Sequence, residues 1–215
     1  GELTMLAENP GNISSWMTDH EGKLRLATTT DGVNNSLLYR KTETDEFQTV
    51  ITTNFRESLS PLFFDFDNQF IYASSNLGRD KAAIIKYDLE KRAEIEELFS
   101  HEEVDVSGLS YSKKRKVLTT ISYTTWKRQY HFLDEKRATL QNRLEEELGD
   151  YEVIIASSNK AEDTYLIRTF SDRSLGAYYI YDENKDKIEK IAEVSPWLEE
   201  TEMAEMKPIQ YKSRD

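Results

Sequence analysis

Three histidines and many serine, aspartate and glutamate side chains are the groups through which this sequence could hydrolyse a substrate or bind a metal. Nucleophilic catalysis needs a base within hydrogen-bond reach of an activated nucleophile, often a serine on a strained G-x-S-x-G turn. No such motif occurs, and His20, His101 and His131 do not stand at metal-ligand spacing. The sequence therefore predicts no catalytic residue, no metal ligand and no cofactor in this segment.

One acidic turn carries oxygen-bearing side chains at alternate positions, as a calcium loop does. These residues are Asp182, Asn184 and Asp186. A calcium loop also needs a glycine at its sharp turn and a closing glutamate, and the glycine is missing. We interpret the segment as the solvated end of a hairpin, because Asp and Asn favour turns.

Composition excludes further classes of function. The chain has 215 residues and no cysteine, so disulfides, thiolate zinc sites and cysteine nucleophiles are excluded. Its net charge of −12 argues against nucleic acid and against an anionic membrane surface, because both need a basic face. No stretch reaches the roughly 20 apolar residues that a membrane-spanning helix needs.

Cationic and aromatic residues in long loops are the remaining candidates for function. They are Arg56, Arg79, Trp126, Lys127 and Arg173. Arg and Trp are typical anchors of interfaces, so we predict that these side chains contact a partner domain or restrict the access of a substrate. Two alternatives stay open: Trp126 is a plain sheet-edge aromatic, and long loops tolerate variety without any function.

The elements that would position these loops are short strands that recur with a fixed period. Residues 84–88, 130–134 and 178–182 share one strand pattern ending in aspartate, at separations of 46 and 48 residues, and residues 37–40 precede them by a further 48. A period of about 40–50 residues with four strands is the size of one β-propeller blade. A β-sandwich with a chance spacing is the alternative.

We therefore predict an all-β chain, a β-propeller fragment of about four four-stranded antiparallel blades in an incomplete ring. The predicted blades cover residues 12–53, 59–100, 104–149 and 151–194. Residues 1–11 are expected to form the outer strand of a preceding blade, and residues 195–215 a linker. Open blade edges present unpaired backbone groups, so we expect self-association through them.

Four segments carry more specific expectations. Residues 92–99 favour a helix by composition but a strand by their place in the repeat. Leu140, Leu144 and Leu148 lie four apart, which predicts a short helix after or in place of the third blade's outer strand, with Gly149 as its stop. Residues 195–200 are expected to form one helical turn with Pro196 at its first position, and residues 206–211 to start another strand.

Two patterns in the chain resemble a known family. Residues 74–88 and 171–182 each combine a loop containing Arg and Asp with a strand ending in Tyr-Asp, and resemble the propeller repeats of TolB and of prolyl-oligopeptidase-type peptidases. Residues 206–215, Met-Lys-Pro-Ile-Gln-Tyr-Lys-Ser-Arg-Asp, are similar to the segment that leads from propeller to hydrolase domain in acylaminoacyl peptidases and dipeptidyl aminopeptidases. The chain thus resembles the propeller portion of such a serine peptidase.

The resemblance implies that this segment is not itself an enzyme. In that family the Ser-Asp-His triad lies in a C-terminal α/β-hydrolase domain, here expected after Asp215, and the propeller favours short peptides by gating access. The implied partners are this hydrolase domain of the same chain and a peptide substrate. The dipeptidyl peptidase branch also uses two propeller glutamates for the substrate amine; residues 145–147 superficially suggest them, without the surrounding aromatic motif.

Two other functions stay open. A stand-alone TolB-like propeller would serve as a protein-binding or scaffold module. A glycosidase-type propeller would need paired acids on its inner strands, where only Glu152, Asp65 and Asp67 occur. The compartment is also open: the cytoplasm fits, and so does the periplasm if a secretory signal preceded Gly1.

Overall fold

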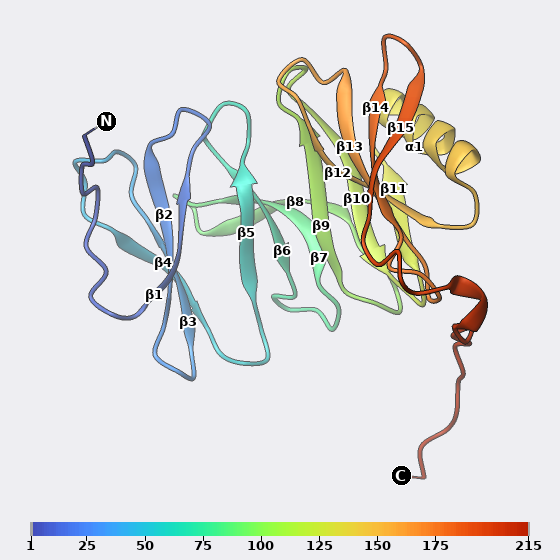
Figure 1. The fold of residues 1–215 in the computed structure, drawn as a ribbon. Helices are drawn as coiled ribbons and strands as arrows, with labels where there is room; N and C mark the ends of the chain where they lie inside the picture. Colours follow the sequence, from blue (N-terminus) through green and yellow to red (C-terminus); the bar gives the residue numbers. More distant parts are fainter. Residues whose placement is uncertain (1, 215) are drawn as a thin grey trace. The chain divides into compact units, whose positions relative to one another are not determined.

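The computed structural model describes residues 2–214 and shows a chain built mainly from antiparallel strands (Figure 1). Within these residues, 15 strands pair with their sequence neighbours into four meander sheets, which we call blades 1 to 4. The predicted all-β class with propeller-type blades is confirmed. No helix in this part of the chain is long and apolar enough to cross a membrane.

The chain divides into two compact units. The first contains the residues up to Leu109 together with Ile121–Thr125 and Gln129–His131. The second contains Ser110–Thr120, Trp126–Arg128 and the residues from Phe132 onward. The predicted incomplete ring concerns the placement of blades across both units, and it stays a prediction.

The first unit contains two four-stranded blades. Blade 1 consists of β1 (Ile13–Thr18), β2 (Leu24–Thr30), β3 (Asn35–Tyr39) and β4 (Gln48–Thr53). Blade 2 consists of β5 (Leu59–Phe64), β6 (Ile71–Ser75), β7 (Ala83–Asp88) and β8 (Ala93–Phe99). The ambiguous residues 92–99 thus supply a strand, because pairing with β7 outweighs the helical preference of their glutamates.

Blades 1 and 2 share one apolar core. Leu26 and Leu37 of blade 1 belong to the same buried cluster as Phe64, Ile71 and Ile85 of blade 2, and none of the five is more than 3% exposed. Alternate residues of a strand point to the same face, so each strand contributes only every second side chain. Burial of each such side chain contributes roughly 1.5–3 kcal/mol.

Blade 3 has three strands, one of the two arrangements that the sequence left open. These are β9 (Val106–Ser112), β10 (Val117–Thr124) and β11 (Arg128–Phe132). The boundary between the two units passes through this sheet. In the first unit, Val106 and Ile121 join Ile84 of β7 in a second buried cluster.

A helix stands in place of the fourth strand of blade 3, as the leucine spacing suggested. Two residues separate the end of β11 from the start of helix α1 (Glu135–Leu148). The Asp134 side chain caps it by accepting a hydrogen bond from the Arg137 amide at 2.9 Å. Two bonds of 2.7 Å from the Arg115 guanidinium hold the same carboxylate and are the main cause of its lowered pKa.

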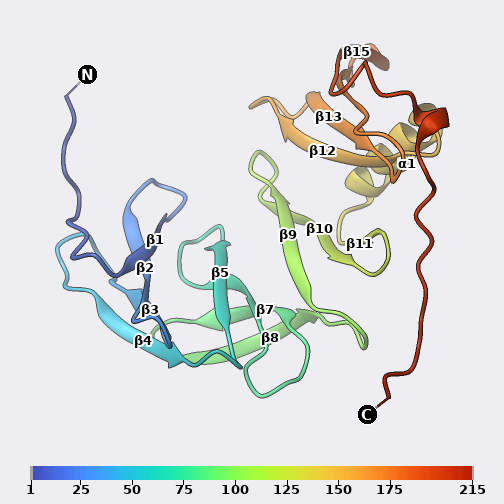
Figure 2. The same ribbon diagram turned by 60° about the horizontal axis from the view of Figure 1, so that its bottom comes forward.

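Blade 4 lies in the second unit and packs against this helix. It consists of β12 (Glu152–Ser158), β13 (Thr164–Phe170), β14 (Ala177–Asp182) and β15 (Lys187–Glu193). Figure 2 shows α1 beside β12 and β13. Leu140 and Leu144 join Val153, Tyr165 and Ile167 in a third buried cluster. Alternate positions of β12 and β13 therefore face the helix.

Aspartates close the short turns of the blades, as predicted. The Oδ1 atom of Asp88 accepts two backbone amides at 2.8 and 2.9 Å, and that of Asp182 accepts two at 3.1 and 3.2 Å. Asp19 and Asp65 accept amides in the same way. These carboxylates satisfy backbone donors of a turn.

Two local predictions about the ends of the chain are wrong, and a third is confirmed only in part. Residues 2–11 contain no strand, and neither do residues 206–211. Over residues 195–200, the Leu198 amide donates to the Ser195 carbonyl at 3.1 Å and closes a single turn around Pro196, but no helix forms. The 3₁₀ turn η1 (Glu200–Glu202) starts four residues after Pro196. A strand needs an edge to pair with, and the side chains Leu3, Met5, Met206 and Ile209 are exposed instead of packed in a sheet.

Candidate interaction site

The loop between β13 and β14 is the centre of the candidate site, and short polar contacts fix its shape. The Ser171 amide donates to the Ser174 carbonyl at 2.9 Å, and the Arg173 amide to the Ser171 hydroxyl at 3.2 Å. The loop returns to the sheet at Gly176, whose φ is +66°. A Cβ at this position would collide with the Thr169 carbonyl, so the turn needs glycine.

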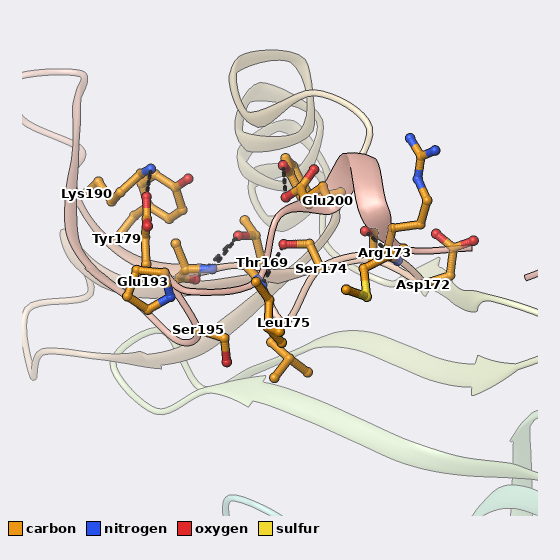
Figure 3. A pocket seen from close by; sticks show the side chains of 17 residues that line it. Thr169, Asp172, Arg173, Ser174, Leu175, Tyr179, Lys190, Glu193, Ser195 and Glu200 are labelled. Carbon is orange, nitrogen blue, oxygen red and sulfur yellow. Dashed lines mark hydrogen bonds and ion pairs between the residues drawn. The ribbon is translucent and has the colours of Figure 1, made fainter. Parts of the chain in front are cut away.

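The buried Thr169 side chain anchors the base of this loop. Its hydroxyl accepts the Ala177 amide at 3.1 Å, and the residue is 1% exposed. Figure 3 shows the Arg173 side chain projecting away from Thr169 beside Glu200 and Asp172. The loop therefore presents a cation next to two carboxylates.

Residues near the end of the described chain are tied to this loop. The Tyr151 hydroxyl donates to Glu200 Oε1 at 2.6 Å. This bond is the main reason why the pKa of Tyr151 rises to about 12. The pKa of Glu200 is lowered, first by a hydrogen bond from Ser174 and then by that from Tyr151. Further along, the Met206 amide donates to Asp172 Oδ2 at 2.7 Å.

Two cavities lie at this end of blade 4. One of about 400 Å³ is lined by the β13–β14 loop, Tyr151 and Glu200. The other, of about 1050 Å³, is lined by Trp126, Lys127, Arg173 and residues 205–208 among others. Trp126 is 64% exposed, and the Lys127 ammonium lies 4.9 Å from the centre of its ring system, which is a cation–π arrangement. The larger cavity thus combines aromatic and charged walls.

Three of the five predicted site residues lie together, and two lie elsewhere. Trp126, Lys127 and Arg173 line the same cavity in the second unit. Arg79 is in the first unit, where its guanidinium contacts both carboxylate oxygens of Glu94 at 2.8 Å. Arg56, also in the first unit, has its guanidinium 5.5 Å from the centre of the Phe55 ring.

Residues Tyr151, Asp172, Glu200 and Met206 were missed by the sequence reasoning. Residues 195–215 read as a linker, so no contact with a blade loop was expected from them. The weak signal was the short acidic run at Glu199 and Glu200, close in sequence to exposed apolar residues. The acidic run alone does not indicate which loop of the blade it contacts.

The other side chains considered for chemistry have structural contacts. His20 Nε2 lies 2.8 Å from the Phe64 carbonyl oxygen, and the His131 ring stacks on Phe99 at 4.5 Å. Asp186 accepts hydrogen bonds from Tyr181 at 3.0 Å and from Arg143. In residues 2–214, no three His, Asp or Glu side chains are grouped so that they could hold a metal ion.

The glutamates at 145–147 lie in the last turn of helix α1. Glu145 accepts from Gln141 Nε2 at 2.6 Å, and Glu147 pairs with Arg143 at 3.0 Å. Such i,i+4 pairs stabilise a helix by a few tenths of a kcal/mol. The contacts support a role in the helix surface.

No family model matches the chain, and no curated protein matches it. Among solved structures, it is similar to a chain of "Crystal Structure of Mitotic Checkpoint Complex", with a TM-score of 0.39 and 11% identity. The similarity covers 88% of this chain and 59% of that one, so this chain spans about three fifths of its neighbour's length. A similarity of this size carries no argument about function.

Proposed function

We propose that the chain is the non-catalytic β-propeller domain of a serine peptidase of the prolyl oligopeptidase family. In this proposal the blades pack on an α/β-hydrolase domain of the same chain. They gate access to its active site, so that short peptides enter and folded proteins do not. The blade architecture and the similarity of residues 206–215 to the family's connecting segment support this proposal.

The main support for this proposal is the exposure of apolar side chains near residue 210. Met206 is 72% exposed, Ile209 81% and Tyr211 85%. A run of exposed large apolar side chains is a common mark of an interface. Because Arg173 and Trp126 lie close to the start of this run, a partner domain with apolar groups and carboxylates would fit it.

The test is the activity of the chain extended by whatever follows Asp215 in its reading frame. We expect hydrolysis of short acylated or dipeptidyl substrates and none of folded proteins. Replacing Arg79 and Arg173 with alanine should weaken domain docking and lower the activity. Lys91→Ala and Lys185→Ala, in the short turns that connect β7 to β8 and β14 to β15, should change neither. If the turn variants disrupt docking and the arginine variants do not, the proposed interface is on the wrong loops.

The alternative is a stand-alone TolB-like module that binds or scaffolds other proteins. The open cavity beside the exposed Trp126 ring favours it, because a binding module needs an accessible site but no hydrolase domain. A reading frame that ends at Asp215 would support this module. A following G-x-S-x-G motif with Asp and His would support the peptidase.

A further inference from the structure

The larger cavity of blade 4 has a stretch of extended chain as one of its walls. Residues 205–208 line it together with Trp126, Tyr151 and Phe170. These four residues form neither helix nor strand. The Met206 amide donates to Asp172 Oδ2 at 2.7 Å. One wall of the cavity is therefore an extended peptide that Asp172 holds through its backbone.

This peptide stretch is held lightly. Its only hydrogen bond to the blade, among those of the described residues, is the one between Met206 and Asp172. The Met206 side chain is 72% exposed, so it contributes little burial. A segment with few buried contacts opens at small free-energy cost, and a competing peptide can take its place.

The remaining walls define which peptide fits. The Trp126 indole is 64% exposed and offers an aromatic surface to a peptide, with the Lys127 ammonium 4.9 Å from its ring centre. The lining that does not come from residues 205–208 includes four carboxylates, those of Asp150, Glu152, Asp172 and Glu200, and two cations, Lys127 and Arg173, so it is acidic on balance. The resident stretch itself places the apolar Met206 before the basic Lys207. The Lys207 ammonium lies 3.5 Å from Glu205 of the same stretch, so a displacing peptide with this order of side chains would bring its basic group to the carboxylates of the blade.

We propose that this groove is a binding site for an extended peptide segment of another protein, which displaces residues 205–208 and carries an apolar residue followed by a basic one. The backbone amide of the incoming apolar residue donates to Asp172, and the neighbouring basic side chain lies among the carboxylates and the indole. The inference does not depend on the peptidase assignment, because binding here involves no bond cleavage.

The experiment uses a fluorescein-labelled peptide with the sequence of residues 203–211 and measures its binding to the 215-residue chain by fluorescence anisotropy. Met206→Pro removes the amide that donates to Asp172 and so frees the groove. We expect this variant to bind the peptide about tenfold more tightly than the unchanged chain, because the occupying segment no longer competes. Ile209→Pro, outside the cavity, is the control and should bind like the unchanged chain.

Two further variants test the groove and the ligand. Trp126→Ala, made together with Met206→Pro, should lose at least tenfold in affinity, and the exposed position of Trp126 leaves the fold intact. A peptide with glutamate in place of its lysine should also bind at least tenfold more weakly. Equal binding by the unchanged chain and the Met206→Pro variant would overturn the proposal, as would indifference to Trp126 or to the charge of the peptide.

Discussion

Hydroxyl and carboxylate groups determine how the loop end of blade 4 is held together. Tyr151, Ser174 and Glu200 form one set of contacts, and Asp172 forms another with the Met206 amide. Arg173 stands between the two sets, close enough to Glu200 to help lower its pKa. The cations that the sequence singled out are therefore one part of a mixed polar site.

The first prediction concerns pH and the Tyr151–Glu200 contact. The pKa of Glu200 is lower in the folded chain than its ordinary value of 4.5. The contact therefore contributes its full stability above about pH 4.5 and loses it as the pH falls through the lowered value. Ser174, Tyr151, Arg173 and Lys190 are the groups that act on Glu200. We expect hydrogen exchange of residues 199–206, corrected for intrinsic rates, to speed up at acid pH.

Tyr151→Phe provides the control for this titration. Without the hydroxyl, exchange of residues 199–206 should already be faster at pH 7, by the equivalent of about 1 kcal/mol for one hydrogen bond. Its change with pH should be smaller than in the unchanged chain. A variant with the same exchange at pH 7 as the unchanged chain would contradict the role given to the bond.

A second prediction compares two glycines with nearly equal backbone angles. Gly176 and Gly78 have φ of +66° and +67°, but a Cβ would strike the Thr169 carbonyl only at Gly176. Gly78→Ala should cost about 1–2 kcal/mol from the left-handed backbone alone. Gly176→Ala should cost about 1–3 kcal/mol more, because the neighbouring strand must shift. Urea denaturation measures both, and equal losses would show that Gly176 is not crowded.

At the scale of the element, helix α1 takes the place of the fourth strand of blade 3. Asp134 begins it and Gly149 ends it, and its leucines face blade 4 and not the solvent. Gln141, at 1% exposure, donates to the Val153 carbonyl at 2.8 Å and so fixes the helix to β12. The helix is thus part of the core of the second unit.

A third prediction follows from this packing. Leu144 is fully buried, so Leu144→Ala should lower the free energy of unfolding by about 2–5 kcal/mol through lost burial and a residual cavity. Asn142→Ala, at an exposed position on the same helix, should change it by less than about 0.5 kcal/mol. Chemical denaturation followed by circular dichroism tests the pair. Similar losses for both variants would mean that the helix does not pack through its leucine face.

Local pattern predicted the strands well, but not the contacts made by distant segments. The aspartate turns and the leucine spacing of α1 are properties of neighbouring residues, and sequence is enough to find them. Residues 206–211 could form a strand only beside a free sheet edge, and local sequence does not show whether such an edge is near. The same holds for the candidate site, because Tyr151 and Asp172 contact Glu200 and Met206 across 49 and 34 residues.

At the scale of the whole molecule, the predicted incomplete ring would leave sheet edges open to other chains, and several large apolar side chains are exposed. Leu3, Met5, Ile209 and Tyr211 are each at least 79% exposed. Apolar patches and unpaired strand edges favour association, while the net charge of −12 opposes it. We infer that association is salt-dependent and weak.

A fourth prediction tests this association. Sedimentation velocity of residues 1–215 should show species larger than a monomer as the concentration rises, and more of them at high salt, where charge repulsion is screened. A compact monomer at all concentrations and salt levels, with a scattering profile of a closed ring, would contradict the predicted open edges.

Hydrolysis by residues 1–215 alone is the measurement that tests the central proposal most directly. Aminoacyl and peptidyl chromogenic substrates would be incubated with the purified chain, beside the same chain extended by its following sequence. We expect no hydrolysis above the blank for residues 1–215, because they contain no G-x-S-x-G motif. We expect clear hydrolysis for the extended chain. Hydrolysis by residues 1–215 that a serine-reactive inhibitor abolishes would contradict it.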